Sequence, residues 1–278
     1  MVEKIYPPWD LTLLKKKYAG AELPLVSIII PTANDAQLIG ATLESIFSQN
    51  YRNFEVIIID SSEDRAIEVV KHYHYSNVNV YSFSQGKRYE MLNKGISQAK
   101  GEYVNILFPG DYYINRDALS QIMLIALDND KADLVYCCGV IRDGHSEAKV
   151  FCHELCIDLL KKGVQPTNLQ SCWFKTEVVR ALGKFDPQYT LRGGYDLMCR
   201  FCLKGYRYAL VNRVLIDYDI HPMTREMVAI HFNETLKIIS CHFGILATLR
   251  WMFFYQKDTQ RYFKLWVRSL RVAFSGRG

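Results

Sequence analysis

The sequence is poor in the features that mark secreted and membrane-spanning proteins. In its 278 residues no apolar run reaches the length needed to cross a bilayer, and the nearest candidate, residues 238–255, contains His242 and Arg250. The first 20 residues include three consecutive lysines but no apolar segment before a cleavage site, so no secretory signal is expected. Internal repeats and low-complexity segments are also missing. These absences favour a cytoplasmic, globular protein.

The eight cysteines are scattered and lack the density of a disulfide scaffold. Cys199 and Cys202 form a C-x-x-C inside a helical pattern, but no second pair accompanies them. Cys152, His153 and Cys156 lie close together in the sequence, yet a structural zinc site takes four ligands at short spacing. We therefore expect buried, reduced thiols and no zinc site.

Charge is nearly balanced, with a formal net charge of +5, and 49% of the residues are hydrophobic. This composition is ordinary for a globular protein. So mild a positive excess does not require a nucleic-acid partner, and none is expected. The length suits one large α/β domain, or one domain with an appendage.

Short, apolar, β-branched runs alternate with amphipathic segments in the first half of the chain. Strands are expected at 26–30, 56–59, 78–83, 103–108 and 133–141, and helices at 36–49, 65–74, 89–100 and 118–127. About thirty residues per strand–helix–strand step is the βαβ period. The sequence therefore predicts an α/β fold with a mostly parallel central sheet flanked by helices.

Beyond residue 141 the pattern becomes mainly helical. Helices are expected at 153–162, 177–182 and 195–204, then an extended segment at 208–218 and a helical, amphipathic region at 226–272. We accordingly divide the chain into an N-terminal leader (1–24), a core domain (25–224) and a basic, aromatic-rich C-terminal helical region (225–278).

Three aspartates follow predicted strands: Asp35, Asp60 and Asp111. In an open α/β sheet, ligands bind beyond the carboxyl ends of the strands, so one nucleotide-sized ligand could contact all three side chains. Two of the three also have a structural interpretation. Asp60 could cap a helix or form an Asx turn, and Asp111 in Pro-Gly-Asp could be an ordinary turn residue.

Six strings occur in the order and spacing found in family 2 glycosyltransferases. They are PTAND, EVIIIDSSED, LNKGISQAKGEYVNILFPGDYY, GKFDP, GGYDLMCRF and DYDIHP. Residues 25–224 thus resemble that family. The resemblance implies a GT-A fold, inverting transfer from a nucleotide-sugar, and a divalent metal, Mg²⁺ or Mn²⁺. A hard cation on carboxylate oxygen would neutralise the charge of a diphosphate leaving group.

The resemblance also assigns site residues. It implies that Asp111 holds the metal, with His221 nearby, and that Asp60 hydrogen-bonds the base, usually uracil. The positions that it assigns to nucleotide binding are Pro31, Thr32, Asp35, Asp60, Lys87, Arg88 and Asn93. Among these, the two cations would offset phosphate charge, although they could equally form a solvated face.

The sequence departs from the family's pattern at two places. The three residues before Asp111 are Phe, Pro and Gly, so Asp111 is the only carboxylate of its motif, and metal affinity should depend on the donor diphosphate. The family's general base belongs to an acidic pair, which here falls on Gly193 and Gly194. Asp196 is the nearest acid. It is either the base or a structural partner of Arg200 at i,i+4.

Residues 226–272 mix aromatic and basic side chains, which favours contact with a membrane interface. The alternative is a helix packed on the core domain. We expect an enzyme of the hexosyl- or N-acetylhexosaminyl-transferase class that uses a UDP-sugar. Its acceptor would be a glycan or lipid-linked sugar in surface polysaccharide synthesis at the inner face of the cell membrane. One alternative is a nucleotide-sugar-binding relative without a base. A nucleotidyltransferase is disfavoured because PTAND is not a Gly-rich loop.

Overall fold

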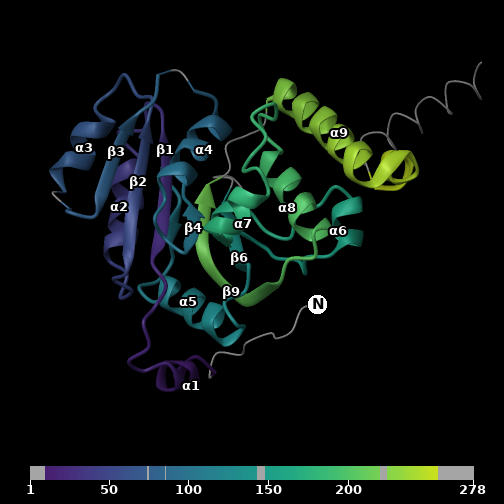
Figure 1. The fold of residues 1–278 in the computed structure, drawn as a ribbon. Coiled ribbons are helices and arrows are strands. Elements are labelled where there is room, and N and C mark those ends of the chain that lie inside the picture. The colour runs from purple at the N-terminus through teal and green to yellow at the C-terminus, as the bar shows by residue number, and fades with distance from the viewer. Residues whose placement is uncertain (1–9, 74, 85, 143–147, 220–223, 256–278) are drawn as a thin grey trace, which may run out of the picture.

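The computed structural model describes residues 10–255 apart from 74, 85, 143–147 and 220–223, and it shows a mixed α/β molecule (Figure 1). The strands are β1 (Val26–Thr32), β2 (Phe54–Asp60), β3 (Val78–Ser82), β4 (Tyr103–Ile106), β5 (Tyr112–Tyr113), β6 (Leu134–Arg142), β7 (Lys149–Phe151), β8 (Cys172–Lys175) and β9 (Tyr208–Asp219). The α-helices are α1 (Asp10–Lys17), α2 (Ile39–Phe47), α3 (Ala66–His72), α4 (Arg88–Gln98), α5 (Ala118–Asp128), α6 (Ile157–Lys161), α7 (Thr176–Ala181), α8 (Gly193–Leu203) and α9 (Arg225–Arg250). Two short turns of other helix types, η1 (Leu169–Ser171) and η2 (Trp251–Tyr255), complete the described chain.

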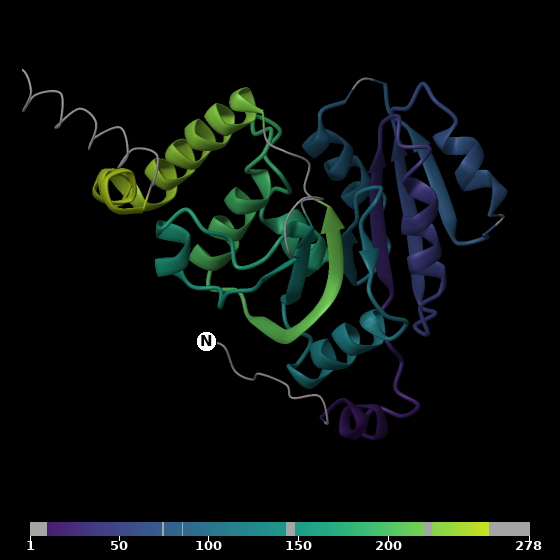
Figure 2. The same ribbon diagram turned by 180° about the vertical axis from the view of Figure 1, so that it is seen from behind.

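One sheet runs through the molecule in the order β3-β2-β1-β4-β8-β6-β9-β5, with β7 paired to β6. β1, β2, β3 and β4 pair in parallel, whereas β8 is antiparallel to both of its neighbours. β9 is long and curls round the second half of the sheet (Figure 2). The parallel half matches the βαβ pattern of the sequence. The carboxyl ends of β1, β2 and β4 therefore lie side by side.

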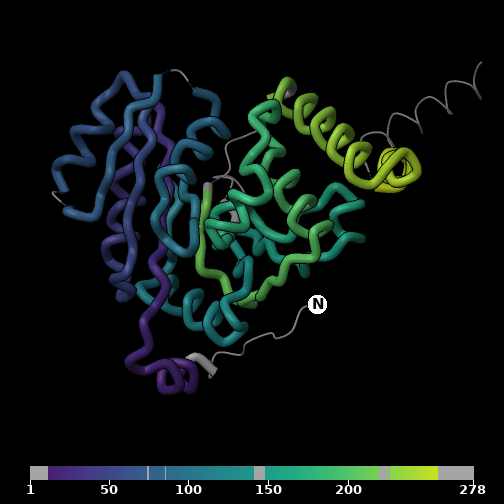
Figure 3. Tube along the Cα trace, in the orientation of Figure 1, coloured from purple at the N-terminus to yellow at the C-terminus, as the bar shows by residue number. Residues whose placement is uncertain are grey.

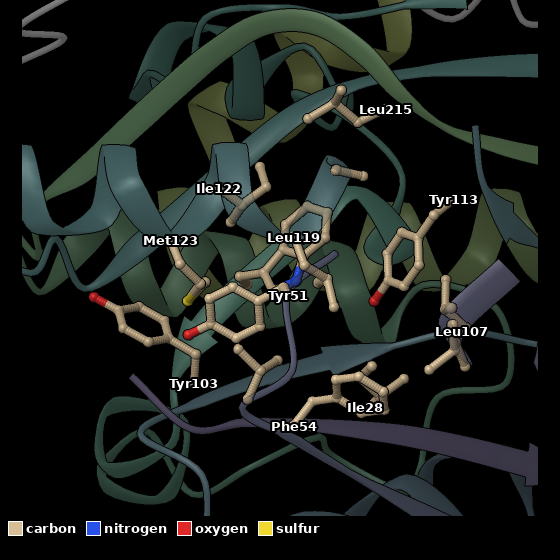
Figure 4. Packing of buried hydrophobic residues seen from close by; sticks show 14 of the residues in the cluster. Ile28, Tyr51, Phe54, Tyr103, Leu107, Tyr113, Leu119, Ile122, Met123 and Leu215 are labelled. Atoms are coloured by element: carbon tan, nitrogen blue, oxygen red, sulfur yellow. The ribbon is translucent and has the colours of Figure 1, made fainter. Parts of the chain in front are cut away.

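The core fills both faces of the sheet, and the strands β1, β2 and β4 are buried along their whole length. On the face covered by α2 and α5, tyrosine rings pack among aliphatic side chains (Figure 4). Two of these tyrosines satisfy their hydroxyls inside the core: Tyr103 donates to Ala132 O at 2.8 Å, and Tyr113 donates to Asn105 Oδ1 at 2.7 Å. Burial raises the pKa of both phenols, so they remain neutral donors.

The sequence placed the longer elements correctly but missed short ones. The strands β5 and β7 and the helix α1 were not expected. The helix predicted at 153–162 begins only at Ile157, because the Tyr136 hydroxyl donates to His153 O and accepts from Leu155 N. These contacts hold the preceding residues in an extended, non-helical path that no local pattern encodes.

The prediction of reduced cysteines is wrong at one pair. Cys138, on β6, forms a disulfide with Cys152, just after β7, with their Cα atoms 4.7 Å apart. The antiparallel pairing of Gly139 with Phe151 brings the two cysteines together. The disulfide therefore links the two strands of a β-hairpin that was not predicted from the sequence. Cys156 and Cys241 are free and exposed, whereas Cys199, in the C-x-x-C, is buried in α8.

α9 lies at the end of the molecule opposite β3 and passes over α8 (Figure 3). Gly244 has a φ of 80° and a ψ of 178°, which kinks the helix. By length and composition alone, Glu226–Tyr255 is apolar enough to cross a membrane. The expectation that no segment reaches that length is therefore wrong.

Candidate functional site

The loops after β1 and β2 are joined to each other by backbone and side-chain hydrogen bonds. Asn34 adopts a left-handed conformation with a φ of 63°. Its Oδ1 accepts from Glu63 N at 2.8 Å and from Asp64 N at 3.2 Å, and its own N–H donates to Ser62 Oγ at 3.0 Å. Asp64 in turn accepts from Ala36 N at 3.0 Å. This network gives the strand ends a fixed shape.

Asp60 and Asp35 both belong to this edge. In the β1–β2 register Asp60 lies opposite Thr32, and its Oδ1 accepts from Ser62 N at 3.0 Å. Asp35 Oδ2 accepts from Ala33 N at 2.8 Å and from Thr32 Oγ1 at 3.3 Å. Each carboxylate thus accepts hydrogen bonds within its own turn, which for Asp60 is the Asx turn of the structural interpretation. Because such turns fix the carboxylate's direction, this local role is compatible with ligand binding.

Asp111 is held by a tight turn after β4. Gly110, with a φ of 96°, supplies the left-handed residue, and its N–H donates to Thr42 Oγ1 at 2.9 Å. Asp111 Oδ2 accepts from Phe108 N at 3.1 Å and from Gln170 Nε2 at 2.9 Å. The carboxylate is buried and oriented before any ligand arrives.

The end of β9 lies near this turn. Tyr112 on β5 pairs with Asp217 on β9, and the Tyr112 hydroxyl donates to Asp217 Oδ2 at 2.9 Å. The pKa of Tyr218 is raised, first by burial and then by the negative charge of Asp111. β9 therefore leads the chain to the neighbourhood of Asp111. His221 follows two residues after β9 and lies outside the described residues.

The donor chemistry at Asp111 fits a hard divalent cation. Within the part of the chain that the structure describes, no group of three or more His, Cys, Asp or Glu side chains could enclose a metal. A buried carboxylate with a fixed direction suits Mg²⁺ or Mn²⁺, which keep most of their ligands as water and phosphate oxygens. Asp111 therefore fits such an ion as a carboxylate ligand.

The first turn of α4 approaches the same loop. The Arg88 guanidinium lies over the Phe108 ring, 4.8 Å from its centroid, and so stands beside the Asp111 turn. Lys87 is exposed, and its backbone N–H donates to Glu90 Oε2 at 2.9 Å. Two cations at a helix N-terminus form a favourable environment for phosphate.

Asn93 has partners in a different segment. Its Nδ2 donates to Phe185 O at 2.8 Å, and its Oδ1 accepts from Phe185 N at 2.9 Å. The amide therefore anchors the loop that contains the GKFDP string to α4. The structure brings Asp35, Asp60, Asp111 and Arg88 towards one edge of the sheet, whereas Asn93 uses both of its polar atoms on this loop.

Asp196 is buried on α8, and both of its oxygens have partners. Oδ2 contacts Arg200, at 2.7 Å from Nη2 and 2.9 Å from Nε, and Oδ1 lies 2.8 Å from His242 Nε2 of α9. Burial raises the pKa of the Asp196 carboxyl, but the hydrogen bonds and charges of His242 and Arg200 outweigh burial and hold the pKa below its usual range. This is the geometry of the structural alternative, the i,i+4 pair with Arg200.

The two glycines at the start of α8 differ in the space around them. A Cβ on Gly193 would lie 2.7 Å from two carbons of the Tyr89 ring. A Cβ on Gly194 would meet only ordinary contacts, the nearest being Gln165 Nε2 at 3.6 Å. Gly193 is therefore required by packing, whereas the structure has room for a side chain at Gly194.

Sequence reasoning missed Glu234 on α9. Its carboxylate accepts from three successive backbone N–H groups, of Thr190, Leu191 and Arg192, at 2.5, 3.0 and 2.8 Å. It thereby fixes the loop that leads into α8. No local signal identifies this residue, because its partners lie more than forty positions earlier. Gln170, which holds Asp111, was missed for the same reason.

Comparison with known proteins supplies the family. The model of Glycosyl transferase family 2 matches residues 27–181, more than half of the chain. An uncharacterized glycosyltransferase of Rickettsia prowazekii is 33% identical over 221 residues, covering 76% of this chain and 69% of that protein. The amylovoran biosynthesis glycosyltransferase AmsB of Erwinia amylovora is 28% identical over 228 residues, covering 76% and 74%.

Solved structures show the same fold. S. aureus TarS (1–349) in complex with UDP-GlcNAc has a TM-score of 0.64 and 19% identity, covering 78% of this chain and 66% of that one. The mannosyltransferase PcManGT of Pyrobaculum calidifontis, in complex with GDP-Man and Mn²⁺, has a TM-score of 0.60 and 17% identity, covering 89% and 79%. The fold is thus GT-A-like, and the chain belongs to glycosyltransferase family 2.

Proposed function

We propose that this protein is a metal-dependent, inverting glycosyltransferase that takes a sugar from a UDP-sugar. The observation that carries the proposal is the placement of Asp60 at the end of β2 and of Asp111 just beyond β4, two parallel strands that flank β1, each in a turn fixed by hydrogen bonds. The bound ligands named for the similar structures support a nucleotide-sugar donor, with UDP-GlcNAc in one and GDP-Man with Mn²⁺ in another.

The donor would lie along the edge formed by β1, β2 and β4. The Asp60 carboxylate would accept from the N–H of the base, with Pro31, Thr32 and Asp35 forming the wall beside the nucleoside. Lys87 and Arg88 would face the diphosphate. Asp111 would hold the divalent ion, which supplies charge neutralisation for the departing diphosphate. The His221 position would complete this end of the site.

The acceptor would be a glycan or a lipid-linked sugar in surface polysaccharide synthesis. The relative named for amylovoran biosynthesis supports that class. Transfer with inversion requires a base that takes the proton of the acceptor hydroxyl. Asp196 is the candidate. To act, it must exchange its contact with His242 for the acceptor, and its lowered pKa makes it a weak base.

This engagement of Asp196 favours a second candidate function, nucleotide-sugar binding without transfer. The two functions differ in turnover and not in donor binding. Gly194→Asp separates them further, because the structure has room for a side chain there and an acid in the first turn of a helix is favourable. If the second function is correct, the wild-type protein binds UDP but does not cleave UDP-sugars to release UDP. The Gly194→Asp variant then gains this cleavage activity.

Calorimetric titration of UDP and GDP, with and without Mn²⁺, tests the donor site. We expect Mn²⁺-dependent binding of UDP that weakens about a hundredfold in Asp111→Asn, a change that keeps the shape of the turn. Asp130→Asn is the matched control, since Asp130 is exposed, remote from this edge and already in a left-handed conformation that Asn tolerates. Binding of neither nucleotide by folded protein would refute the proposal.

A further inference from the structure

The last part of α9 carries an exposed apolar surface. Ile245 and Leu246 are 72% and 80% exposed, and Leu249 and Phe253 follow on the same side of the helix at 44% and 51%. We call these four residues the C-terminal apolar surface. Thr248 and Trp251, on the opposite side, are buried against the protein. The segment is therefore amphipathic in three dimensions, with one face packed and the other facing solvent.

A basic cleft adjoins this surface, between α6 and the end of α9. Its volume is about 440 Å³, and its lining includes Lys161, Lys162 and Arg250 with a single acid, Asp158. The Lys162 ammonium lies 5.7 Å, and the Arg250 guanidinium 6.0 Å, from the centroid of Tyr255. Three cations thus stand next to the C-terminal apolar surface. The sequence beyond residue 255 adds six Lys and Arg against one Asp.

We propose that this end of the molecule docks on an anionic lipid bilayer. The C-terminal apolar surface would enter the acyl boundary while the basic cleft binds headgroup phosphate. Apolar insertion beside clustered cations is the combination that holds amphipathic helices at an interface. The proposal goes beyond donor binding and sugar transfer, because it concerns a surface on α9, at the end of the molecule opposite β3 (Figures 1 and 2).

The geometry favours lying on the membrane over crossing it. Before Gly244, α9 is packed on the protein, with Thr235, Ile238 and Ile239 fully buried, so that part cannot enter lipid. After the kink about a dozen residues remain in the described helix, roughly 18 Å of length. A span needs about 20 residues, or roughly 30 Å.

A second copy of the chain is a poorer occupant. In a two-fold interface the same patch faces itself, so Lys161, Lys162 and Arg250 of one copy would approach the same cations of the other. Like charges brought together in this way oppose association. An anionic lipid surface complements both the apolar side chains and the cations.

Co-sedimentation with vesicles tests the proposal, using phosphatidylcholine alone or with one third phosphatidylglycerol. We expect full-length protein to bind the anionic vesicles, and Lys161→Glu/Lys162→Glu/Arg250→Glu to weaken binding about a hundredfold or more, because each cation near an anionic surface contributes about fivefold. Lys71→Glu/Lys100→Glu/Lys149→Glu, at three exposed positions elsewhere, is the matched control and should retain most of the binding. Leu246→Asp should weaken binding about tenfold, whereas Val150→Asp, at a 62% exposed position on β7, should not.

Three results would overturn the inference. These are no binding to either vesicle, equal binding by the cleft and control variants, or a dimer that Leu246→Asp converts to monomer without affecting vesicle binding. Thermal melts confirm that each variant is folded. UDP titration of the same variants keeps this test separate from the donor site, since none of these residues lies at that edge of the sheet.

Discussion

The two halves of the site are held by different kinds of contact. Around β1, β2 and β4, most of the orienting contacts come from a side chain's own turn or from the neighbouring loop, as Phe108 N does for Asp111, although Gln170 adds one distant contact to Asp111. Around α8, the orienting groups come from a helix far along the chain, as Glu234 and His242 do. The geometry of the first half should therefore be little affected by substitutions on α9. The geometry of the second half should depend on the packing of α9 against α8.

The largest effect is expected at Asp196. Asp196→Ala leaves Arg200 and His242 without their buried carboxylate, so the free energy of unfolding should fall by roughly 3 kcal/mol. Glu68→Ala, which removes an exposed ion pair with Arg65, is the control and should change little. Urea denaturation of both variants measures the difference. Equal losses would mean that the α8–α9 contact is not energetically special.

The same contact predicts a pH dependence. Because the pKa of Asp196 is lower in the folded protein, its contribution is fully present above the ordinary carboxyl pKa of about 4. It is lost as the pH falls further, through the folded pKa. The stability difference between wild type and Asp196→Asn should therefore shrink as the pH falls below about 4. Urea midpoints measured across that range check this, and a difference independent of pH would contradict it.

Glu234→Ala should have the next largest effect, about 2 kcal/mol, because three backbone N–H groups lose a charged acceptor. Amide exchange should accelerate at Thr190, Leu191 and Arg192 more than in the loops after β1 and β2. Glu226→Ala, at the exposed start of the same helix, serves as the control. Uniform acceleration throughout the protein would argue against a local restraint on this loop.

A change in the first half should stay local. Asn34→Ala loses two hydrogen bonds and places Ala at a φ of 63°, so we expect a loss of about 2 kcal/mol. Asn34→Gly removes the same bonds without the backbone strain and should lose less. UDP affinity should fall in both variants while exchange at Thr190 to Arg192 remains unchanged. Faster amide exchange at Thr190 to Arg192 in these variants would contradict the view that the two halves of the site are held independently.

The smallest effect concerns the start of α8. Gly194→Ala should be neutral or stabilise by up to about 1 kcal/mol, because the site is open and Ala favours a helix. Gly193→Ala should destabilise by about 1 kcal/mol or more, since its Cβ would lie 2.7 Å from the Tyr89 ring. Thermal denaturation of the pair measures the contrast. The opposite order would mean that the α8 backbone shifts freely.

The same difference explains what the sequence could predict. Continuous apolar runs identify β1, β2 and β4 in the sequence, and Pro, Gly and Asp identify the turns that follow them. The sequence therefore predicted correctly that Asp60 and Asp111 lie beyond the carboxyl ends of parallel strands. The role of Gln170 depends on β8 being antiparallel to β4, which no periodicity shows. The Cys138–Cys152 disulfide depends on the short pairing of β6 with β7. The pairing of strands that lie far apart in the chain cannot be recognised from the local pattern of a single sequence.

The link from Glu234 and His242 to α8 has a consequence for how the protein can be divided. The sequence suggests a core domain that ends at residue 224. A chain cut there would lose the acceptor of three loop amides and one of the two partners of Asp196. The C-terminal helix, which the sequence places outside the core domain, thus adds Thr235, Ile238 and Ile239 to the buried interior of the described structure.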